Sequence, residues 1–189
     1  MASEWLDLLA DEPTQVESDG TAILAVRTKL SGFDVMLLTC DFACRAGTLG
    51  VREGRALVTV LDQACEAQAV VFVVASGGVR VDEGAAAFIQ MARIMVARQK
   101  LAEARRPFIA IAADPTLGGM AASLTATADI ILALPGARLG FSGPKTSAVF
   151  SGVRIDSAES ALNAGLVDDV IPPEAIKNTV ARYLRVLCG

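Results

Sequence analysis

The sequence predicts an α/β fold in one domain, and three observations support this. The chain has 189 residues, of which 53% are hydrophobic and 20% are charged, enough for one sizeable core but not for two. Apolar runs without polar alternation, typical of buried strands, alternate with helical patterns. One unit, a buried strand followed by a glycine turn and a helix, occurs twice. We therefore expect residues 1–189 to form a single domain, with residues 1–19 as an extended or helical arm.

Two β-rich runs open the predicted sheet. Residues 21–30 (TAILAVRTKL) and 34–43 (DVMLLTCDFA) are separated by the turn sequence SGF, which predicts a hairpin. Residues 50–68 follow as a helix, and residues 69–76 (AVVFVVAS) read as a buried strand because they are apolar throughout.

A long helix is expected next. Asp82 is the expected N-cap, because its carboxylate can accept hydrogen bonds from the free N–H groups of a first helical turn, and the helix should end before Pro107. Its inward face is predicted from residues at helical spacing. These residues are Phe88, Met91, Ala92 and Met95.

The second half repeats the pattern. Residues 106–114 (RPFIAIAAD) predict another buried strand and residues 118–129 a short helix. Residues 130–141 predict two short strands around Pro135 and Gly136, and residues 157–187 predict a helix, a strand at GLVDDVI and a closing helix.

Composition excludes several kinds of chemistry. The sequence contains no histidine, so Ser-His-Asp triads, Cys-His pairs and histidine-ligated metals are excluded. The four cysteines, Cys40, Cys44, Cys65 and Cys188, include no CxxC pair and predict buried thiols in a reducing compartment rather than a metal site or redox motif. Any chemistry must therefore come from carboxylates, lysine, hydroxyl groups or the backbone.

Charge and hydropathy narrow the expected partners. The net charge is -4 and there is no run of basic residues, which argues against a nucleic-acid partner. The sequence shows neither the basic start and apolar stretch of a signal peptide nor an apolar run of membrane-spanning length. We therefore expect a cytoplasmic protein without a membrane partner.

Both repeated units carry a glycine pair, Gly77 with Gly78 and Gly118 with Gly119. The pairs stand between a strand end and an expected helix start, where unpaired N–H groups and the positive end of the helix dipole can bind an oxyanion. Glycine pairs also serve tight turning or close helix packing alone. Two pairs in parallel units favour the oxyanion site.

Several segments resemble the β-type half of acyl-CoA carboxylase carboxyltransferases, in the crotonase superfamily. The resemblance rests on SGGVRVDEG, QMARI, DPTLGGMAASL, DIILALPGARLGFSGP and NAGLVDDVI, and it extends over roughly residues 20–170. Malonate decarboxylase β subunits share much of the pattern. The resemblance implies a crotonase-like spiral of ββα units with a thioester substrate lying across the two glycine turns.

The resemblance also implies roles for individual residues. Backbone N–H groups at Gly118 and Gly119 would hold the thioester oxygen as it becomes an enolate, and Gly77 and Gly78 would line the opposing turn. Preorganised donors stabilise such an oxyanion without a titrating side chain. Replacing Gly119 by valine is therefore expected to abolish activity while leaving the fold largely intact. Substrate-binding positions would be Ser76, Arg80, Thr116, Met120, Phe141, Gly143 and Pro144.

Three polar residues have competing interpretations. Arg80 can meet a carboxylate or a coenzyme A phosphate, because a guanidinium suits both, or it can be an exposed surface arginine. Asp114 is more readily explained as a residue that orients the turn through backbone hydrogen bonds than as a general base, and Thr116 can do the same. Lys145 is expected to be solvated rather than bound to phosphate.

The chain also departs from the family pattern. It lacks the four-cysteine zinc ribbon of bacterial β subunits, so no structural zinc is expected, and after SGP it continues with KTSAVFSGVRIDSAES instead of an arginine and a VIEQ-like segment. A crotonase-type hydratase is disfavoured, because MAASLTAT replaces the usual glutamate pair.

Three hypotheses about function remain. The first is a carboxyltransferase β-like subunit acting on a coenzyme A or acyl-carrier-protein thioester, the second a biotin-independent malonyl-thioester decarboxylase subunit, and the third a non-catalytic scaffold for an active α-type subunit. No tightly bound cofactor is expected. Biotin would be carried by a partner, since the sequence has no Met-Lys-Met attachment motif. The expected partners are an α-type subunit or further copies of the chain, and a biotin carboxyl carrier or acyl carrier protein.

Overall fold

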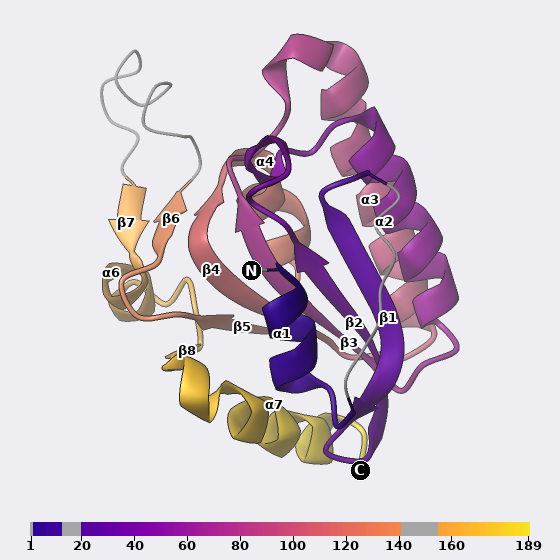
Figure 1. Cartoon of the computed structure of the whole chain (residues 1–189), viewed down its shortest axis with the longest axis vertical. Helices are drawn as coiled ribbons and strands as arrows, with labels where there is room; N and C mark the ends of the chain where they lie inside the picture. The colour runs from indigo at the N-terminus through magenta and orange to yellow at the C-terminus, as the bar shows by residue number, and fades with distance from the viewer. Residues whose placement is uncertain (1, 13–19, 141–154) are drawn as a thin grey trace.

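The computed structural model describes residues 2–12, 20–140 and 155–189. In these ranges a central sheet has helices α2 and α3 on one face and α1 and α7 on the other (Figure 1). The main strand order is β1-β2-β3-β4-β5-β8, and β6 joins it beside β4. This mixed α/β architecture with a largely parallel sheet confirms the predicted fold class.

The hairpin predicted at the start of the sheet is present. β1 (Ile23–Leu30) and β2 (Phe33–Cys40) pair antiparallel from Ile23 opposite Cys40 to Leu30 opposite Phe33. Ser31 and Gly32 form the turn with φ of 50° and 86°. A two-residue turn with both φ positive matches the twist of the strands that it joins.

Parallel strands form the middle of the sheet. They are β3 (Ala69–Ser76), β4 (Phe108–Leu117), β5 (Ile130–Ala133) and β8 (Asp169–Val170). β4 extends further than the sequence predicts, because residues 115–117 continue the strand instead of forming a turn. Its last residues pair with β6 (Arg138–Gly140), which pairs antiparallel with β7 (Ile155–Ser157).

Helices α2 (Val51–Ala64) and α3 (Ala85–Glu103) cover one face. The predicted start of α3 at Asp82 is wrong: a 3-10 turn occupies Val81–Glu83, and Gly84, with φ of 53°, is the N-cap. The predicted inward positions of Phe88 and Ala92 are also wrong, because both residues are exposed, Phe88 by 57%. The residues of α3 that are buried are Ala87, Gln90, Ile94, Ala97, Arg98 and Leu101.

The opposite face carries the two ends of the chain (Figure 1). α1 (Ala2–Leu9) supplies the buried Leu6 and Leu9, and α7 (Pro173–Leu187) packs in the same core. The N-terminal arm is therefore helical over the residues of α1. α6 (Ala158–Asn163) adds a smaller cluster beside β5.

The expected short helix after the second glycine pair takes an unusual form. α4 (Gly118–Met120) is only one turn long and continues as a π-helical segment, Ala121–Thr125. π-helical turns are rare and are frequent at functional sites. The buried side chains of Met120 and Leu124 anchor this region in the core under α2 and α3.

Candidate functional site

The two glycine pairs meet in space. β3 and β4 are neighbours, and Ser76 of β3 lies in register with Thr116 of β4, so the turns that follow them emerge side by side. Gly78 has φ of 107° and Gly118 has φ of 58°. A Cβ atom on Gly78 would lie 3.2 Å from Gly118 Cα. The two backbones are thus in direct contact, as the repeated unit predicts.

Unpaired N–H groups gather where the turns touch. Val79 forms a bridge with Leu49 in which the Leu49 N–H donates to Gly78 O at 2.8 Å and the Arg80 N–H donates to Leu49 O at 2.9 Å. The Val79 N–H takes part in neither of these two hydrogen bonds. Among the described residues it has no acceptor. Gly119 lies in the first turn of α4, where backbone N–H groups have no acceptor within the helix. These two donors form a candidate oxyanion site.

The first glycine pair differs from the sequence-based expectation. Its N–H groups already have acceptors: Gly77 donates to Ala46 O at 2.8 Å and Gly78 to Ser76 Oγ at 3.1 Å. It does not stand at a helix start either, since α3 begins only at Ala85. The free donor on this turn is the backbone of Val79, which the sequence analysis missed because a valine side chain carries no chemical signal.

The small size of Gly119 has a different cause from the one expected. A Cβ atom there would overlap Val79 Cγ2 and come within 2.9 Å of Met91 Sδ. The missing side chain therefore leaves room for two neighbouring side chains. The expected Gly119→Val test is consequently unsuitable, because the substitution would disturb the packing that joins the two turns.

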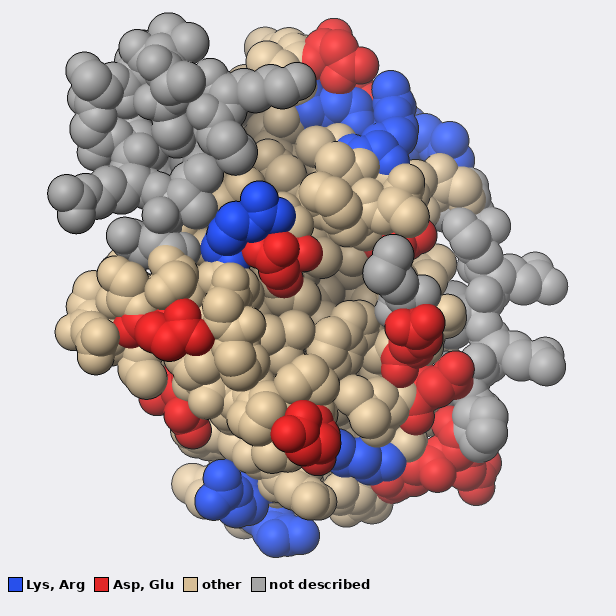
Figure 2. Space-filling model, turned by 60° about the vertical axis from the view of Figure 1, so that its left-hand side comes forward, with Lys and Arg blue, Asp and Glu red and all other residues tan. Residues whose placement is uncertain are grey.

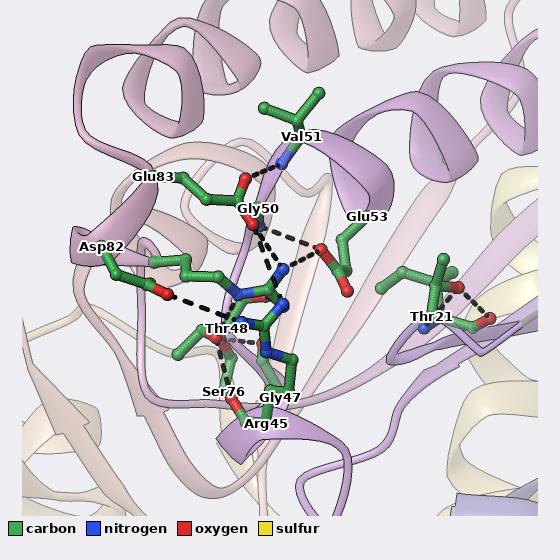
Figure 3. A network of polar contacts seen from close by, with 12 residues as sticks. Thr21, Arg45, Gly47, Thr48, Gly50, Val51, Glu53, Ser76, Asp82 and Glu83 are labelled. Carbon is green, nitrogen blue, oxygen red and sulfur yellow. Dashed lines mark hydrogen bonds and ion pairs between the residues drawn. The ribbon is translucent and has the colours of Figure 1, made fainter.

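Arg80 is neither exposed nor free for a ligand, so both interpretations of it are wrong. It is 4% exposed and forms ion pairs of 2.8 Å with Glu53 and with Glu83. Its Nε donates to Thr48 Oγ1 at 3.1 Å and its Nη2 to Thr48 O at 2.9 Å. Figure 3 shows Thr48, Glu53 and Glu83, the partners of Arg80, close to one another. The side chain holds the first turn in place from inside the fold.

The two glutamates of this network also hold the start of α2. Glu53 accepts the N–H of Gly50 at 3.2 Å, and Glu83 accepts the N–H of Val51 at 2.6 Å (Figure 3). The Val51 N–H, together with Arg80, lowers the pKa of Glu83 below its ordinary value. Both carboxylates thus satisfy backbone donors that a helix leaves open at its N-terminus. The network ties α2 to the first glycine turn.

A strained segment supports the same turn from the other side. Arg45, Ala46 and Gly47 have φ of 50°, 55° and 60°, a run of left-handed residues that costs energy at the two non-glycine positions. The thiol of Cys40 donates to Gly47 O at 3.3 Å. Burial raises the pKa of this thiol to about 12, so it is not a nucleophile. All four cysteines are free, but the prediction that they are buried is right for Cys40 alone, since the other three are partly exposed.

Two predicted substrate-binding hydroxyl groups point into the fold. Ser76 is fully buried and donates to Gly47 O at 2.7 Å. Thr116 is also fully buried, with Oγ1 2.7 Å from Val74 O and 2.8 Å from Ala113 O. Met120, a third predicted contact, is 1% exposed in the core. Because they are buried, these three side chains are better placed to support the turns than to contact a ligand. The expectations for Phe141, Gly143, Pro144 and Lys145 fall outside the described residues.

Asp114 joins two strands at the edge of the site. Its carboxylate accepts hydrogen bonds from Nε and Nη2 of Arg138, at 2.8 Å and 3.0 Å, and from the Arg138 N–H at 2.9 Å. Arg138 lowers the pKa of Asp114 below its ordinary value. A carboxylate with a lowered pKa is a poor general base near neutral pH. The structure therefore agrees with an orienting role for Asp114.

Within the described residues, the structure holds no cluster of three or more potential metal ligands, and no helix is long and apolar enough to span a membrane. Figure 2 shows one face of the molecule, on which basic and acidic side chains lie next to one another in several small groups.

Comparison with known proteins gives a consistent result. The carboxyl transferase domain family matches residues 7–169. The acetyl-coenzyme A carboxylase carboxyl transferase subunit beta of Bartonella grahamii is 35% identical over 97% of this chain. The same subunit of Wolinella succinogenes is 33% identical over 93% of it. The chain spans 61% and 62% of the lengths of these relatives.

Solved structures show the same fold. A Pseudomonas malonate decarboxylase MdcD-MdcE heterodimer matches with a TM-score of 0.85 and 23% identity, covering 98% of this chain and 86% of that chain. Transcarboxylase 12S, whose structure is described as a hexamer with hydrolysed methylmalonyl-coenzyme A bound, matches with a TM-score of 0.80 and 22% identity. That match covers 97% of this chain and 40% of the transcarboxylase chain.

Proposed function

The chain belongs to the carboxyl transferase domain family, and on that premise we propose that it is a carboxyltransferase β-like subunit that stabilises a thioester enolate during carboxyl transfer. One observation carries the proposal: the contact between Gly78 and Gly118 brings the unpaired N–H group of Val79 near that of Gly119 in the first turn of α4. Donors from two different turns can converge on one oxygen, as an oxyanion hole requires.

The chemistry that these donors suit is movement of a carboxyl group at the carbon next to a thioester. When the carboxyl group leaves, the bond to the α carbon breaks and its electron pair delocalises onto the thioester oxygen. Hydrogen bonds from fixed N–H groups stabilise this negative charge more than the neutral carbonyl. The α carbon then takes a proton from solvent. In the opposite direction, the enolate carbon would bond to the carboxyl carbon supplied by a carboxylated biotin, and the bond from that carbon to the biotin nitrogen would break, with its electron pair left on the nitrogen. No step needs histidine.

Coenzyme A is the proposed carrier of the acyl group. The names of the relatives refer to acetyl-coenzyme A, and similar folds were solved with coenzyme A or methylmalonyl-coenzyme A. An acyl carrier protein thioester offers the same reacting carbonyl group. Biotin, attached to a partner, would supply or accept the carboxyl group. An α-type subunit, or another copy of this chain, would complete the site.

A biotin-independent decarboxylase subunit is the second candidate. Its support is the fold similarity to malonate decarboxylase. The match covers 86% of the malonate decarboxylase chain but only 40% of the transcarboxylase chain. The same N–H donors would serve this reaction, with loss of carbon dioxide in place of transfer. A non-catalytic scaffold remains the third candidate, and activity measurements separate the three.

The experiment is to incubate the purified chain with malonyl-CoA and to detect acetyl-CoA by mass spectrometry, with and without free biotin and with and without a co-expressed α-type subunit. Product that requires biotin supports the carboxyltransferase. Product without biotin supports the decarboxylase. An absence of product in every condition supports either a different acyl substrate or the scaffold.

A matched pair of variants tests the oxyanion site in whichever condition gives product. Val79→Pro removes the N–H but leaves the two Leu49 hydrogen bonds available, whereas Val79→Ala keeps the N–H and shortens the side chain. Loss of one oxyanion donor costs about 100-fold to 1000-fold in kcat, so we expect this loss for V79P and a much smaller one for V79A. Thermal unfolding confirms that both are folded. Equal kcat values in the two folded variants would contradict the assignment.

A further inference from the structure

Two hydroxyl side chains support the backbone behind the second glycine turn. Ser123 Oγ donates to Gly119 O at 2.5 Å, and Thr127 Oγ1 donates to Ser123 O at 3.0 Å. Each hydroxyl group thus bonds the carbonyl group four residues before it. We name Ser123 and Thr127 the hydroxyl ladder. The ladder ends at Gly119, one of the two proposed oxyanion donors.

The ladder lies where the backbone hydrogen bonds change their spacing. The Ala121 N–H donates to Gly118 O, three residues back, whereas the Ala126 N–H donates to Ala121 O, five residues back. The chain thus passes from the tight turn of α4 into the π-helical segment. The bond from Ser123 to Gly119 spans four residues and connects these two geometries. A side chain therefore supports the backbone at this junction.

Burial alone does not account for the Ser123 hydrogen bond. Ser123 and Thr125 are each 3% exposed, so both hydroxyl groups are shielded from water. Thr125 Oγ1 nevertheless has no hydrogen-bond partner among the described residues. A hydroxyl group that bonds a carbonyl group four residues back also slightly destabilises a helix. This segment thus tolerates an unpaired buried hydroxyl group, and the bond at Gly119 has another explanation.

The backbone direction at Gly119 depends on its hydrogen bonds. A glycine has wide freedom in both backbone torsions because it lacks a Cβ atom, and each peptide unit beside it is planar. The unit before Gly119 is held by the bond from the Ala121 N–H to Gly118 O. The unit after it is held by the bond from Ser123 Oγ to Gly119 O. Oxyanion donors act by being fixed in place before the charge develops, so both anchors matter.

We propose that Ser123 is a positioning residue of the oxyanion site. Its hydroxyl group holds the peptide unit after Gly119, which keeps the Gly119 N–H directed at the thioester oxygen together with the Val79 N–H. In this role Ser123 neither touches the substrate nor transfers a proton, because its hydroxyl hydrogen is directed at Gly119 O. Thr127 supports Ser123 from the next step of the ladder. The effect on catalysis rests on the proposed function, whereas the constraint on Gly119 does not.

Kinetics of two single variants test the effect on catalysis. Ser123→Ala removes the bond to Gly119, and Thr125→Val removes an equally buried hydroxyl group of the same segment that has no partner among the described residues. The assay uses malonyl-CoA in whichever condition gives acetyl-CoA. We expect kcat of S123A to fall about 10-fold to 100-fold, because a misdirected donor stabilises the transition state less. KM of S123A, and both constants of T125V, should stay within about twofold of the wild type.

Backbone dynamics measured by NMR test the constraint without substrate. In protein with isotope-labelled glycine, the order parameter of the Gly119 N–H should be about 0.85, the value of a rigid backbone, and should fall toward about 0.6 in S123A. Gly47 is the reference and should keep its value. Alanine has the highest helix propensity, so we expect S123A to fold, which thermal unfolding checks. If it does not fold, Thr127→Val, which removes the next step of the ladder, should lower kcat and the Gly119 order parameter in the same direction.

The outcomes distinguish this proposal from the proposed function. A folded S123A protein with an unchanged kcat, or with an unchanged Gly119 order parameter, overturns the positioning role. Equal losses of kcat in S123A and T125V also overturn it, because they would assign the effect to the segment as a whole. A loss of Gly119 rigidity in S123A, with no product from the wild type in any condition, would support the constraint on Gly119 and count against the proposed function alone.

Discussion

The two glycine turns are held by different forces. The first turn is surrounded by polar groups: Arg80 beneath it is 4% exposed and bonded to two carboxylates and to Thr48. The second turn is held by shape, since Gly119 packs against Val79 and Met91. A buried charge network stabilises the fold only while every member is paired. Close packing stabilises it only while the side chains fill the available volume. The two turns should therefore respond to different substitutions.

The largest expected effect comes from the charge network. Arg80→Met keeps most of the side-chain volume but leaves Glu53, 3% exposed, without its cation. Breaking a buried ion pair in this way costs about 3 to 5 kcal/mol, so the free energy of unfolding from urea titration should fall by this amount. Arg80→Lys should give an intermediate loss, because an ammonium cannot reproduce the forked contacts.

Arg45→Met is the matched control for the first prediction. Arg45 is 59% exposed and pairs with Asp82 at 3.5 Å, so its removal should cost at most about 1 kcal/mol. The double variant R80M/E53Q should be more stable than R80M, because it no longer buries an unpaired carboxylate. Similar losses in R80M and R45M would show that the network does not hold the first turn.

A smaller loss of stability is expected when the contact between the two turns is disturbed at Gly78. The neighbouring Gly77 serves as the control position. Gly78→Ala forces a side chain onto φ of 107° and within 3.2 Å of Gly118 Cα, which should cost about 1 to 3 kcal/mol. A Cβ atom on Gly77 would lie 3.4 Å from Ala46 O, 3.5 Å from Thr48 Cγ2 and 3.7 Å from Ala46 Cβ. These are ordinary contacts, so for Gly77→Ala a change within about 0.5 kcal/mol is expected. Thermal unfolding measures both, and equal losses would refute the close backbone contact.

The smallest effect should come from Asp114, at the edge of the second turn. Its folded-state pKa is lowered by Arg138, so the pair stabilises the fold above the ordinary pKa of aspartate and loses this contribution as pH falls through the lowered value. Asp114→Asn should cost about 0.5 to 1 kcal/mol at pH 7, because both side chains are about half exposed.

Urea titrations of the wild type and D114N at several pH values check this prediction. The difference in the free energy of unfolding should shrink toward acidic pH. A difference that is independent of pH would mean that the carboxylate charge does not contribute.

The main elements of the fold follow from local sequence patterns. The strand Ala69–Ser76 was predicted with its observed bounds, and the hairpin at Ser31 and Gly32 from its turn residues. Uninterrupted apolar runs and turn residues determine these elements with little help from distant parts of the chain. The pairing of the two glycine turns was also predicted, because parallel strands in repeated units end at the same edge of a sheet.

Only the tertiary structure decided which contacts and ion pairs individual residues form. Nothing near Arg80 in sequence indicates that Glu53 pairs with it, since the contact depends on where α2 begins. The neighbours of Gly119 come from the first turn and from α3, and the partner of Asp114 from β6. Short-range patterns set backbone conformation, whereas burial and charge pairing depend on elements that meet only after folding. The sequence by itself thus determined where the chain turns, and the packed structure determined which atoms those turns leave free.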